Sequence, residues 1–174
     1  MMKHKDQRVS VFVDAQNMYH SAKNLYGANL NFQEVLTTAV AGRKLARAIV
    51  YGIASPGGDE EKFLEALEKQ GFELRVKDLQ IFAGGAKKGD WDVGMAVDAI
   101  KGADKVDVIV LVTGDGDFIP LVQYLQESKG CLVELISFQK STSSRLIEAV
   151  DDFIDLSSDP NRFLMRKNVR RPKR

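Results

Sequence analysis

Short apolar runs alternate along the chain with stretches in which apolar residues recur every three or four positions. The runs are typical of buried strands, and the longer period is typical of helices that pack by one face. Strands and helices in alternation predict an α/β fold with a mainly parallel sheet. Five strands are predicted, at residues 8–14, 45–53, 72–82, 107–113 and 131–137. Helices are predicted after the first strand, with a break near Tyr26 and Gly27, and at residues 32–41, 59–71, 91–100, 118–128 and 145–154.

The pattern within the strands also predicts where a ligand binds. Residues 107–113 are nearly all Val, Ile or Leu, as in a central strand, whereas residues 72–82 alternate as in an edge strand. Right-handed crossovers favour the strand order 3-2-1-4-5. Ligands of such sheets bind beyond the carboxyl ends of the strands where the order reverses, here between the first and fourth strands.

Aspartates cluster where these strands end or a helix begins. Asp14 ends the first strand, Asp115 and Asp117 follow the fourth, and Asp92 opens the helix at residues 91–100. Strands one and four are predicted to be neighbours, so we expect these carboxylates to converge. Converging carboxylates repel one another, and they either share a proton or bind a divalent cation. The four aspartates are therefore candidate metal ligands and catalytic residues.

Each aspartate also has a purely structural explanation. Asp90 and Asp92 can cap the helix or lie in its first turn, and for Asp90 we expect capping alone. Asp115 and Asp117 can form a Gly-Asp turn that caps the next helix. A single aspartate would be explained in this way, but four that converge at one place favour the functional interpretation.

Weaker candidates for substrate binding are polar or aromatic side chains near the same strand ends. Asn17 offers an amide oxygen to a cation or an N–H to a phosphate. Trp91 can stack on a base, although packing as an apolar wedge against its helix is the favoured explanation. Asp98 points about 120° away from Asp92 on an ideal helix, so it reaches only the edge of a shared pocket. The full set of weaker candidates is Asn17, Lys88, Trp91, Asp98, Ser141 and Arg145.

The charge of the chain is uneven. Residues 162–174 contain seven Lys or Arg and no acidic residue, whereas the remainder holds 18 basic and 24 acidic residues, a net charge of −6. A basic arm on an acidic body suits binding to a polyanion, and a solvated, disordered terminus explains it equally well. We expect a flexible N-terminus at residues 1–7, one domain at residues 8–157 and a basic tail at residues 158–174.

Several classes of protein are disfavoured by what the 174 residues contain. Cys131 is the only cysteine, so no disulfide within the chain and no cysteine-rich zinc site is expected. No Walker A motif, glycine-rich dinucleotide loop or Gly-x-Ser-x-Gly elbow is present. The first residues lack the apolar stretch of a signal peptide, and no apolar run approaches the ~20 residues that span a bilayer. We therefore expect a cytoplasmic protein that does not enter a membrane.

Three motifs in order resemble those of the NYN domains, a branch of the PIN-like nuclease superfamily, and specifically the LabA-like group. They are Val-Asp-x-x-Asn at 13–17, Lys-Gly-Asp-Trp-Asp-Val at 88–93 followed by Ala-Val-Asp at 96–98, and Thr-Gly-Asp-Gly-Asp-Phe at 113–118. The resemblance spans residues 9–156. It implies a PIN-like, Rossmann-like three-layer α/β/α sandwich with a mainly parallel five-stranded sheet.

The resemblance also implies a function. It predicts an acidic pocket that binds Mg²⁺ or Mn²⁺ and cleaves RNA, with Asp14, Asp92, Asp115 and Asp117 as its acidic residues and Asn17 as their polar partner. Hydrolysis of a phosphodiester needs an activated water and stabilisation of negative charge, and a cation held by carboxylates supplies both. RNA is the expected partner, and a homodimer is possible.

Two other functions are considered. A non-catalytic RNA-binding or regulatory protein could keep the same acidic pocket, because ligand geometry finer than an ångström decides turnover. A phosphatase of the haloacid dehalogenase type is suggested by Gly-Asp-Gly-Asp at 114–117. Those enzymes need an aspartate two residues after the nucleophile, and that position is Gln16 here, so we rank this function low.

Overall fold

Six parallel strands form the central sheet of the computed structural model, which describes residues 3–54, 59–78, 80–81, 87–88 and 90–166. Their spatial order is β4-β3-β1-β7-β8-β9, and every neighbouring pair is parallel. The strands are β1 (Arg8–Asp14), β3 (Lys44–Ala54), β4 (Glu73–Asp78), β7 (Val108–Val112), β8 (Leu132–Ser137) and β9 (Asp152–Asp155). The first five of these positions follow the predicted order 3-2-1-4-5, and β4 lies at the edge as predicted.

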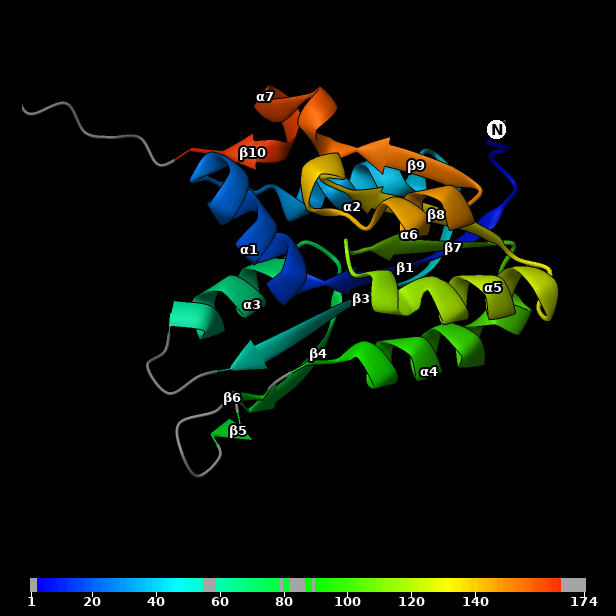
Figure 1. Cartoon of the computed structure of the whole chain (residues 1–174), viewed down its shortest axis with the longest axis horizontal. Helices are drawn as coiled ribbons and strands as arrows, with labels where there is room; N and C mark the ends of the chain where they lie inside the picture. The colour runs from blue at the N-terminus through cyan, green and yellow to red at the C-terminus, as the bar shows by residue number, and fades with distance from the viewer. Residues whose placement is uncertain (1–2, 55–58, 79, 82–86, 89, 167–174) are drawn as a thin grey trace, which may run out of the picture.

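Helices cover both faces of this sheet, which gives the three layers of an α/β/α sandwich (Figure 1). The helices are α1 (Ala15–Tyr26), α2 (Phe32–Val40), α3 (Asp59–Lys69), α4 (Asp92–Gly102), α5 (Ile119–Glu127), α6 (Ser144–Ala149) and α7 (Pro160–Phe163). Short 3-10 turns are η1 (Ala103–Lys105), η2 (Gly116–Phe118), η3 (Gln139–Ser141) and η4 (Leu156–Ser158). Two small ribbons pair β2 (Asn29–Leu30) with β10 (Leu164–Met165) and β5 (Gln80–Ile81) with β6 (Lys87–Lys88).

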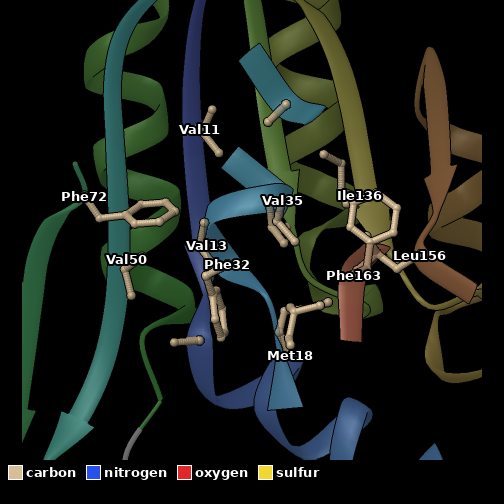
Figure 2. Close-up of a cluster of buried hydrophobic side chains, with 14 of the residues drawn as sticks. Val11, Val13, Met18, Phe32, Val35, Val50, Phe72, Ile136, Leu156 and Phe163 are labelled. Carbon is tan, nitrogen blue, oxygen red and sulfur yellow. The ribbon is translucent and has the colours of Figure 1, made fainter. Parts of the chain in front are cut away.

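Alternate residues of each central strand enter opposite cores, because successive side chains of a strand point to opposite faces. Val11 and Val13 of β1 point toward α1, α2 and α3, where they pack with Met18 and Phe32 (Figure 2). Phe12, between them, points to the other face and packs against α4 and α5. Both faces of β1 and β7 are therefore buried, which explains the nearly continuous apolar sequence of these strands.

The sixth strand corrects the sequence prediction. Residues 145–154 were expected to form one helix, but α6 ends at Ala149, and β9 then pairs in parallel with β8. Asp151 fixes this change of direction, because its carboxylate accepts hydrogen bonds from the Val133 backbone N–H at 2.8 Å and from Gln126 Nε2 at 3.0 Å. The residues of β9 thus pair with the open edge of β8 although their apolar positions have helical spacing. The sheet was predicted to have five strands, and it has six.

Both predicted termini contact the domain where the structure describes them. Gln7, in the segment expected to be flexible, accepts a hydrogen bond from the Lys44 N–H at 3.0 Å. Phe163 is buried, and Leu164 pairs with Leu30 between β10 and β2. Phe163 and the strand β10, which lie within the segment predicted as the tail at 158–174, therefore pack against the domain. Residues 167–174 lie outside the described residues.

An ion pair lies inside the sandwich. Arg43 donates to the two carboxylate oxygens of Glu134 at 2.8 and 2.9 Å, and both side chains are fully buried. The remaining donors of Arg43 reach the carbonyls of Ala39 and Val40 and the side chain of Gln7. This pair joins the turn after α2 to β8. Within the described ranges, none of the helices has the length and apolar character that crossing a membrane requires.

Candidate acidic site at the strand ends

The register of the sheet brings the ends of β1 and β7 together beside Tyr51 of β3. Val13 of β1 pairs with Val112 of β7, so Asp14 and Thr113 lie side by side where these strands end. On the other side of β1, Asp14 pairs with Tyr51 of β3. The predicted neighbourhood of strands one and four is confirmed, and it places the residues that follow β1 and β7 at one edge of the sheet.

Three of the four predicted aspartates form a compact group. Asp92, Asp115 and Asp117 each offer a carboxylate oxygen, and these oxygens lie within 4.8 Å of one another. They line a cavity of about 390 Å³ at the carboxyl ends of the strands. Five carboxyl groups and no lysine or arginine are among the described residues that line this acidic pocket. The lining residues are Asp14, Gln16, Asn17, His20, Tyr51, Ile53, Asp90, Trp91, Asp92, Asp115 and Asp117.

Asp14 lines the same pocket but lies outside the group of three. Its Oδ1 accepts a hydrogen bond from the Asn17 backbone N–H at 3.2 Å, so it caps the N-terminus of α1. Its Oδ2 accepts one from the Thr113 hydroxyl at 3.4 Å. Asp14 thus joins the end of β1 to the end of β7, and its capping bond explains why a helix begins directly after the strand.

The loop after β7 is held in place by hydrogen bonds. Asn17 Oδ1 accepts from the Gly114 N–H at 2.9 Å, and Thr113 Oγ1 accepts from the Asp115 N–H at 3.2 Å. Asp115 Oδ1 accepts from the Asp117 N–H at 2.9 Å, which folds η2 so that both carboxylates face the pocket. A side chain is excluded at Gly114, since a Cβ there would lie 2.5 Å from the backbone oxygen of Ser141.

Burial and mutual repulsion perturb the titration of the acidic pocket. Burial, together with the negative charges of Asp115, Asp14 and Asp90, raises the pKa of Asp92 to about 6. Burial also raises the pKa of Asp14, although the hydrogen bonds from Asn17 and Thr113 oppose the shift. Carboxylates with raised pKa values that converge at one place are typical of functional sites.

The weaker candidates separate into those that line the pocket and those that do not. Trp91 lines the pocket, and contacts within the protein hold its side chain in place. Its Nε1 donates to the Gly52 carbonyl at 2.8 Å. Its ring packs against Tyr51 and lies beneath the Lys77 ammonium. Asn17 also lines the pocket, with its amide oxygen already bonded to Gly114.

Three other weaker candidates, Asp98, Ser141 and Arg145, are not among the described residues that line the pocket. Asp98 accepts a hydrogen bond from the Tyr51 hydroxyl at 2.7 Å and lies 3.8 Å from Arg75. Ser141 donates to the Phe138 carbonyl at 3.4 Å, and Arg145 is exposed. Lys88 belongs to β6, and its side chain lies outside the described part of the structure.

Sequence reasoning missed several residues that line or brace the site. Asp90 lines the pocket. The N-cap residue of α4 is Trp91, which makes no capping hydrogen bond through its side chain. The expected capping role of Asp90 is therefore wrong. Gln16 and His20 reach the pocket from the exposed side of α1. Tyr51 could have been found, since it lies near the end of the strand predicted beside the first one. The sequence does not indicate the role of Thr113, because that role depends on the register of β1 and β7.

A family comparison agrees with this architecture. Residues 8–157 match the model of the NYN domain. The chain belongs to the NYN domain family. Proteins of this family are generally nucleases.

Individual proteins are similar to this chain over most of its length. The low amplitude and bright protein LabA of Synechococcus elongatus is 28% identical over 166 residues, covering 90% of this chain and 87% of LabA. An uncharacterised protein of Methanocaldococcus jannaschii is 26% identical, covering 88% of this chain and 57% of that protein. The crystal structure of a protein of unknown function from Vibrio parahaemolyticus is 32% identical with a TM-score of 0.84, covering 95% of this chain and all of that one.

The donor set of this NYN domain suits a hard divalent cation. Mg²⁺ and Mn²⁺ take oxygen ligands, and Mg²⁺ in particular is bound through one or two carboxylates together with water and substrate phosphate. Asp92, Asp115 and Asp117 supply such oxygens within 4.8 Å of one another. Cysteine is absent from the described lining, and His20 is the single histidine there, which does not suit a zinc centre.

Proposed function

We propose that this NYN domain is a metal-dependent ribonuclease that hydrolyses RNA phosphodiester bonds at the acidic pocket, with Mg²⁺ or Mn²⁺ as its cofactor. The observation that carries the proposal is the group formed by Asp92, Asp115 and Asp117, whose oxygens lie within 4.8 Å. No described lysine or arginine of the pocket lining offsets their charge. The assignment to RNA rests on the family to which the chain belongs.

The aspartates have different roles in this proposal. Asp92, Asp115 and Asp117 hold the cation, directly or through water. Asp117 is the most exposed of the three, so it is also suited to orient the attacking water. Asp14 is partly engaged by Asn17 and Thr113, and it contributes negative charge and fixes the strand ends. When bound, the cation would make the water more acidic and neutralise charge on the phosphate.

The remaining residues build the site and exclude alternatives. Asn17 holds the loop that carries Asp115, so it is a positioning residue rather than a cation ligand. Trp91 and Tyr51 form the wall beside Asp92, and the hydrogen bonds of both side chains are made to the protein. Gln16 occupies the place where a phosphatase of the haloacid dehalogenase type needs its second aspartate. This residue disfavours the phosphatase, and the proposed activity is therefore that of a nuclease.

Cleavage of a labelled RNA of mixed structure tests the proposal. The purified protein is incubated with Mn²⁺, with Mg²⁺ or with EDTA, beside the variants Asp115→Asn and Asp104→Asn. Asp104 is a matched control, because it is an exposed aspartate outside the pocket that pairs with Lys129. We expect products with the metal ions, none with EDTA, none with Asp115→Asn, and wild-type activity with Asp104→Asn.

Each other outcome has a definite meaning. RNA that binds in a metal-dependent manner without being cut would replace the nuclease by a non-catalytic RNA-binding protein. Equal cleavage by Asp115→Asn and wild type would show that the activity does not come from this pocket. Circular dichroism of both variants verifies that each is folded. The homodimer stays a prediction, which sedimentation of the purified protein checks.

A further inference from the structure

A second cavity lies beside the acidic pocket. It has a volume of about 360 Å³ and is enclosed by α1, α3 and the end of β3, which meet at the same end of the sheet (Figure 1). This volume is in the range of sites that bind small organic groups. The lining residues are Ala15, Gln16, Tyr19, His20, Gly52, Ile53, Glu60, Phe63 and Leu64.

The two cavities are adjacent. Gln16, His20 and Ile53 line both of them, so these side chains form the boundary between the acidic pocket and the second cavity. A group in the second cavity would therefore be joined to a group in the acidic pocket by only a short connection. In a nucleotide, the base and the phosphate are separated by one sugar.

The chemistry of the second cavity differs from that of the acidic pocket. Most of its lining is apolar or aromatic, with Tyr19, Phe63 and Leu64 on the walls. Glu60 adds a carboxylate, and the described lining holds no lysine or arginine. A phosphate would be repelled there, whereas the face of a base can stack on an aromatic ring and its edge can hydrogen-bond to polar side chains.

The aromatic side chains are set up for such contact. Tyr19 is 41% exposed, and the ammonium of Lys23, four residues further along α1, lies over its ring at 5.7 Å from the centroid. A base that stacks on this face of the ring displaces a solvent-facing lysine side chain. The centroid of the Tyr19 ring lies 5.7 Å from that of His20 and 6.4 Å from that of Phe63. Phe63 in turn packs edge-on against buried Phe32 at 5.4 Å, which anchors the group to the core. The exposed ring is thus held by its neighbours before any ligand binds.

We propose that the second cavity binds the base of a nucleotide next to the phosphate that lies at the acidic pocket. This inference rests on the proposed ribonuclease function and names its substrate more closely. A base in a duplex is stacked and paired, so it cannot enter a separate cavity unless it is unpaired. The preferred substrate is therefore RNA that is single-stranded at the site of cleavage.

The experiment measures RNA binding rather than cleavage, so that the two proposals can fail separately. Fluorescence anisotropy follows a labelled single-stranded RNA of ten nucleotides with Mn²⁺, over times at which a gel shows intact RNA, and again with EDTA. The variants are Tyr19→Ala, Tyr19→Phe and Tyr124→Ala. Tyr124 is a matched control, because it is 43% exposed on α5 and outside the described lining of both cavities.

The expected results depend on the ring. Loss of one stacked base weakens binding by about 5- to 100-fold, so we expect this change for Tyr19→Ala and little change for Tyr19→Phe or Tyr124→Ala. A series of RNAs, each with one base removed, locates the contact. At one position, removal of the base should weaken wild-type binding and abolish the difference between wild type and Tyr19→Ala.

Three results would overturn the inference. They are equal binding by wild type and Tyr19→Ala, a base-removal series without a position that depends on Tyr19, and tighter binding of duplex than of single-stranded RNA. If RNA is cut but these results are found, the nuclease stands and the base site fails. If the base site responds as expected but RNA is never cut, the base site stands and the nuclease proposal fails. Absence of RNA binding overturns both.

Discussion

The side-chain oxygen of Asn17 accepts a hydrogen bond from the backbone N–H of Gly114 at 2.9 Å. This bond joins the first turn of α1 to the loop that follows β7, two segments separated by nearly a hundred residues. Asp14 and Asp115 flank the two ends of the bond, so their separation depends on it. The amide is therefore a brace of the acidic pocket, and its oxygen already accepts one hydrogen bond within the protein.

Removal of this brace should weaken metal binding more than it weakens the fold. We expect Asn17→Ala to lower Mn²⁺ affinity by about tenfold, comparable to the loss of groups that orient metal ligands. The free energy of unfolding should fall by about 1 kcal/mol, the usual contribution of one hydrogen bond. Calorimetric titration with Mn²⁺ and urea unfolding measure the two effects. Asn24→Ala, an exposed asparagine on the same helix, should change neither, and unchanged affinity in Asn17→Ala would contradict the bracing role.

The raised pKa of Asp92 predicts how stability changes with pH in EDTA. Its value of about 6 in the folded protein exceeds the ordinary value of 3.8, so the folded state retains a proton that the unfolded state loses. The contribution of Asp92 to stability is therefore present below pH 4 and is lost as the pH rises to about 6. Asp92→Asn should then be more stable than wild type by ~1 kcal/mol at pH 7, after allowance for solvent screening.

Urea unfolding of both proteins between pH 4 and pH 8 tests this expectation. Other groups titrate in the same range, so the difference between wild type and Asp92→Asn is the relevant quantity. It should grow as the pH rises through about 4 to 6 and then stay constant. A difference that is independent of pH would show that Asp92 has an ordinary pKa. Saturating Mn²⁺ should reverse the order of stability, because wild type alone keeps all three ligands.

The buried ion pair of Arg43 and Glu134 should stabilise the fold only as a pair. Arg43→Met leaves the buried Glu134 carboxylate with only Lys3, at 3.7 Å, as a charged partner, and should lower the free energy of unfolding by about 3 kcal/mol. The double variant Arg43→Met/Glu134→Leu should recover most of that loss. Arg47→Met is a matched control, since Arg47 pairs with Glu73 on the surface and should contribute less than about 1 kcal/mol. Equal losses in Arg43→Met and Arg47→Met, measured by urea unfolding, would contradict this account.

The order of the first five strands could be predicted from the sequence because it follows from local pattern and the handedness of crossovers. The apolar runs of β1 and β7 mark central strands, and the aspartates after them mark the reversal of strand order. The sixth strand could not be predicted in this way. Residues 150–154 have apolar positions at helical spacing, and only the unpaired edge of β8 and the hydrogen bonds of Asp151 make them a strand.

The acidic residues of the candidate site could be predicted from the sequence, but the hydrogen bonds that hold them in place could not. Asp14, Asp92, Asp115 and Asp117 carry a signal because their positions relative to strands and helices are local. The roles of Thr113 and Asn17 depend on the register between β1 and β7, which one residue's identity does not reveal. Tyr19 and Phe63 belong to two helices that meet only in the folded protein, so the cavity between them had no sequence signal.

The folded position of Phe163 changes how the basic tail should be tested. Removal of residues 162–174 would delete a buried side chain and β10, whereas removal of 167–174 deletes five of the seven basic residues and keeps both. If those five contact RNA phosphates, the slope of log K against log salt should become shallower by up to about 3.5. Anisotropy titrations at several salt concentrations measure it, and an unchanged slope would mean that residues 167–174 are not an RNA contact.

Binding of Mn²⁺ tests the central claim most directly, because every proposed role of the acidic pocket depends on it. Free Mn²⁺ is measured by electron paramagnetic resonance during titration of wild type, Asp115→Asn and Asp104→Asn. The account predicts saturable binding by wild type and Asp104→Asn, and at least about tenfold weaker binding by folded Asp115→Asn. Equal binding by wild type and Asp115→Asn, or no binding by wild type, would contradict it.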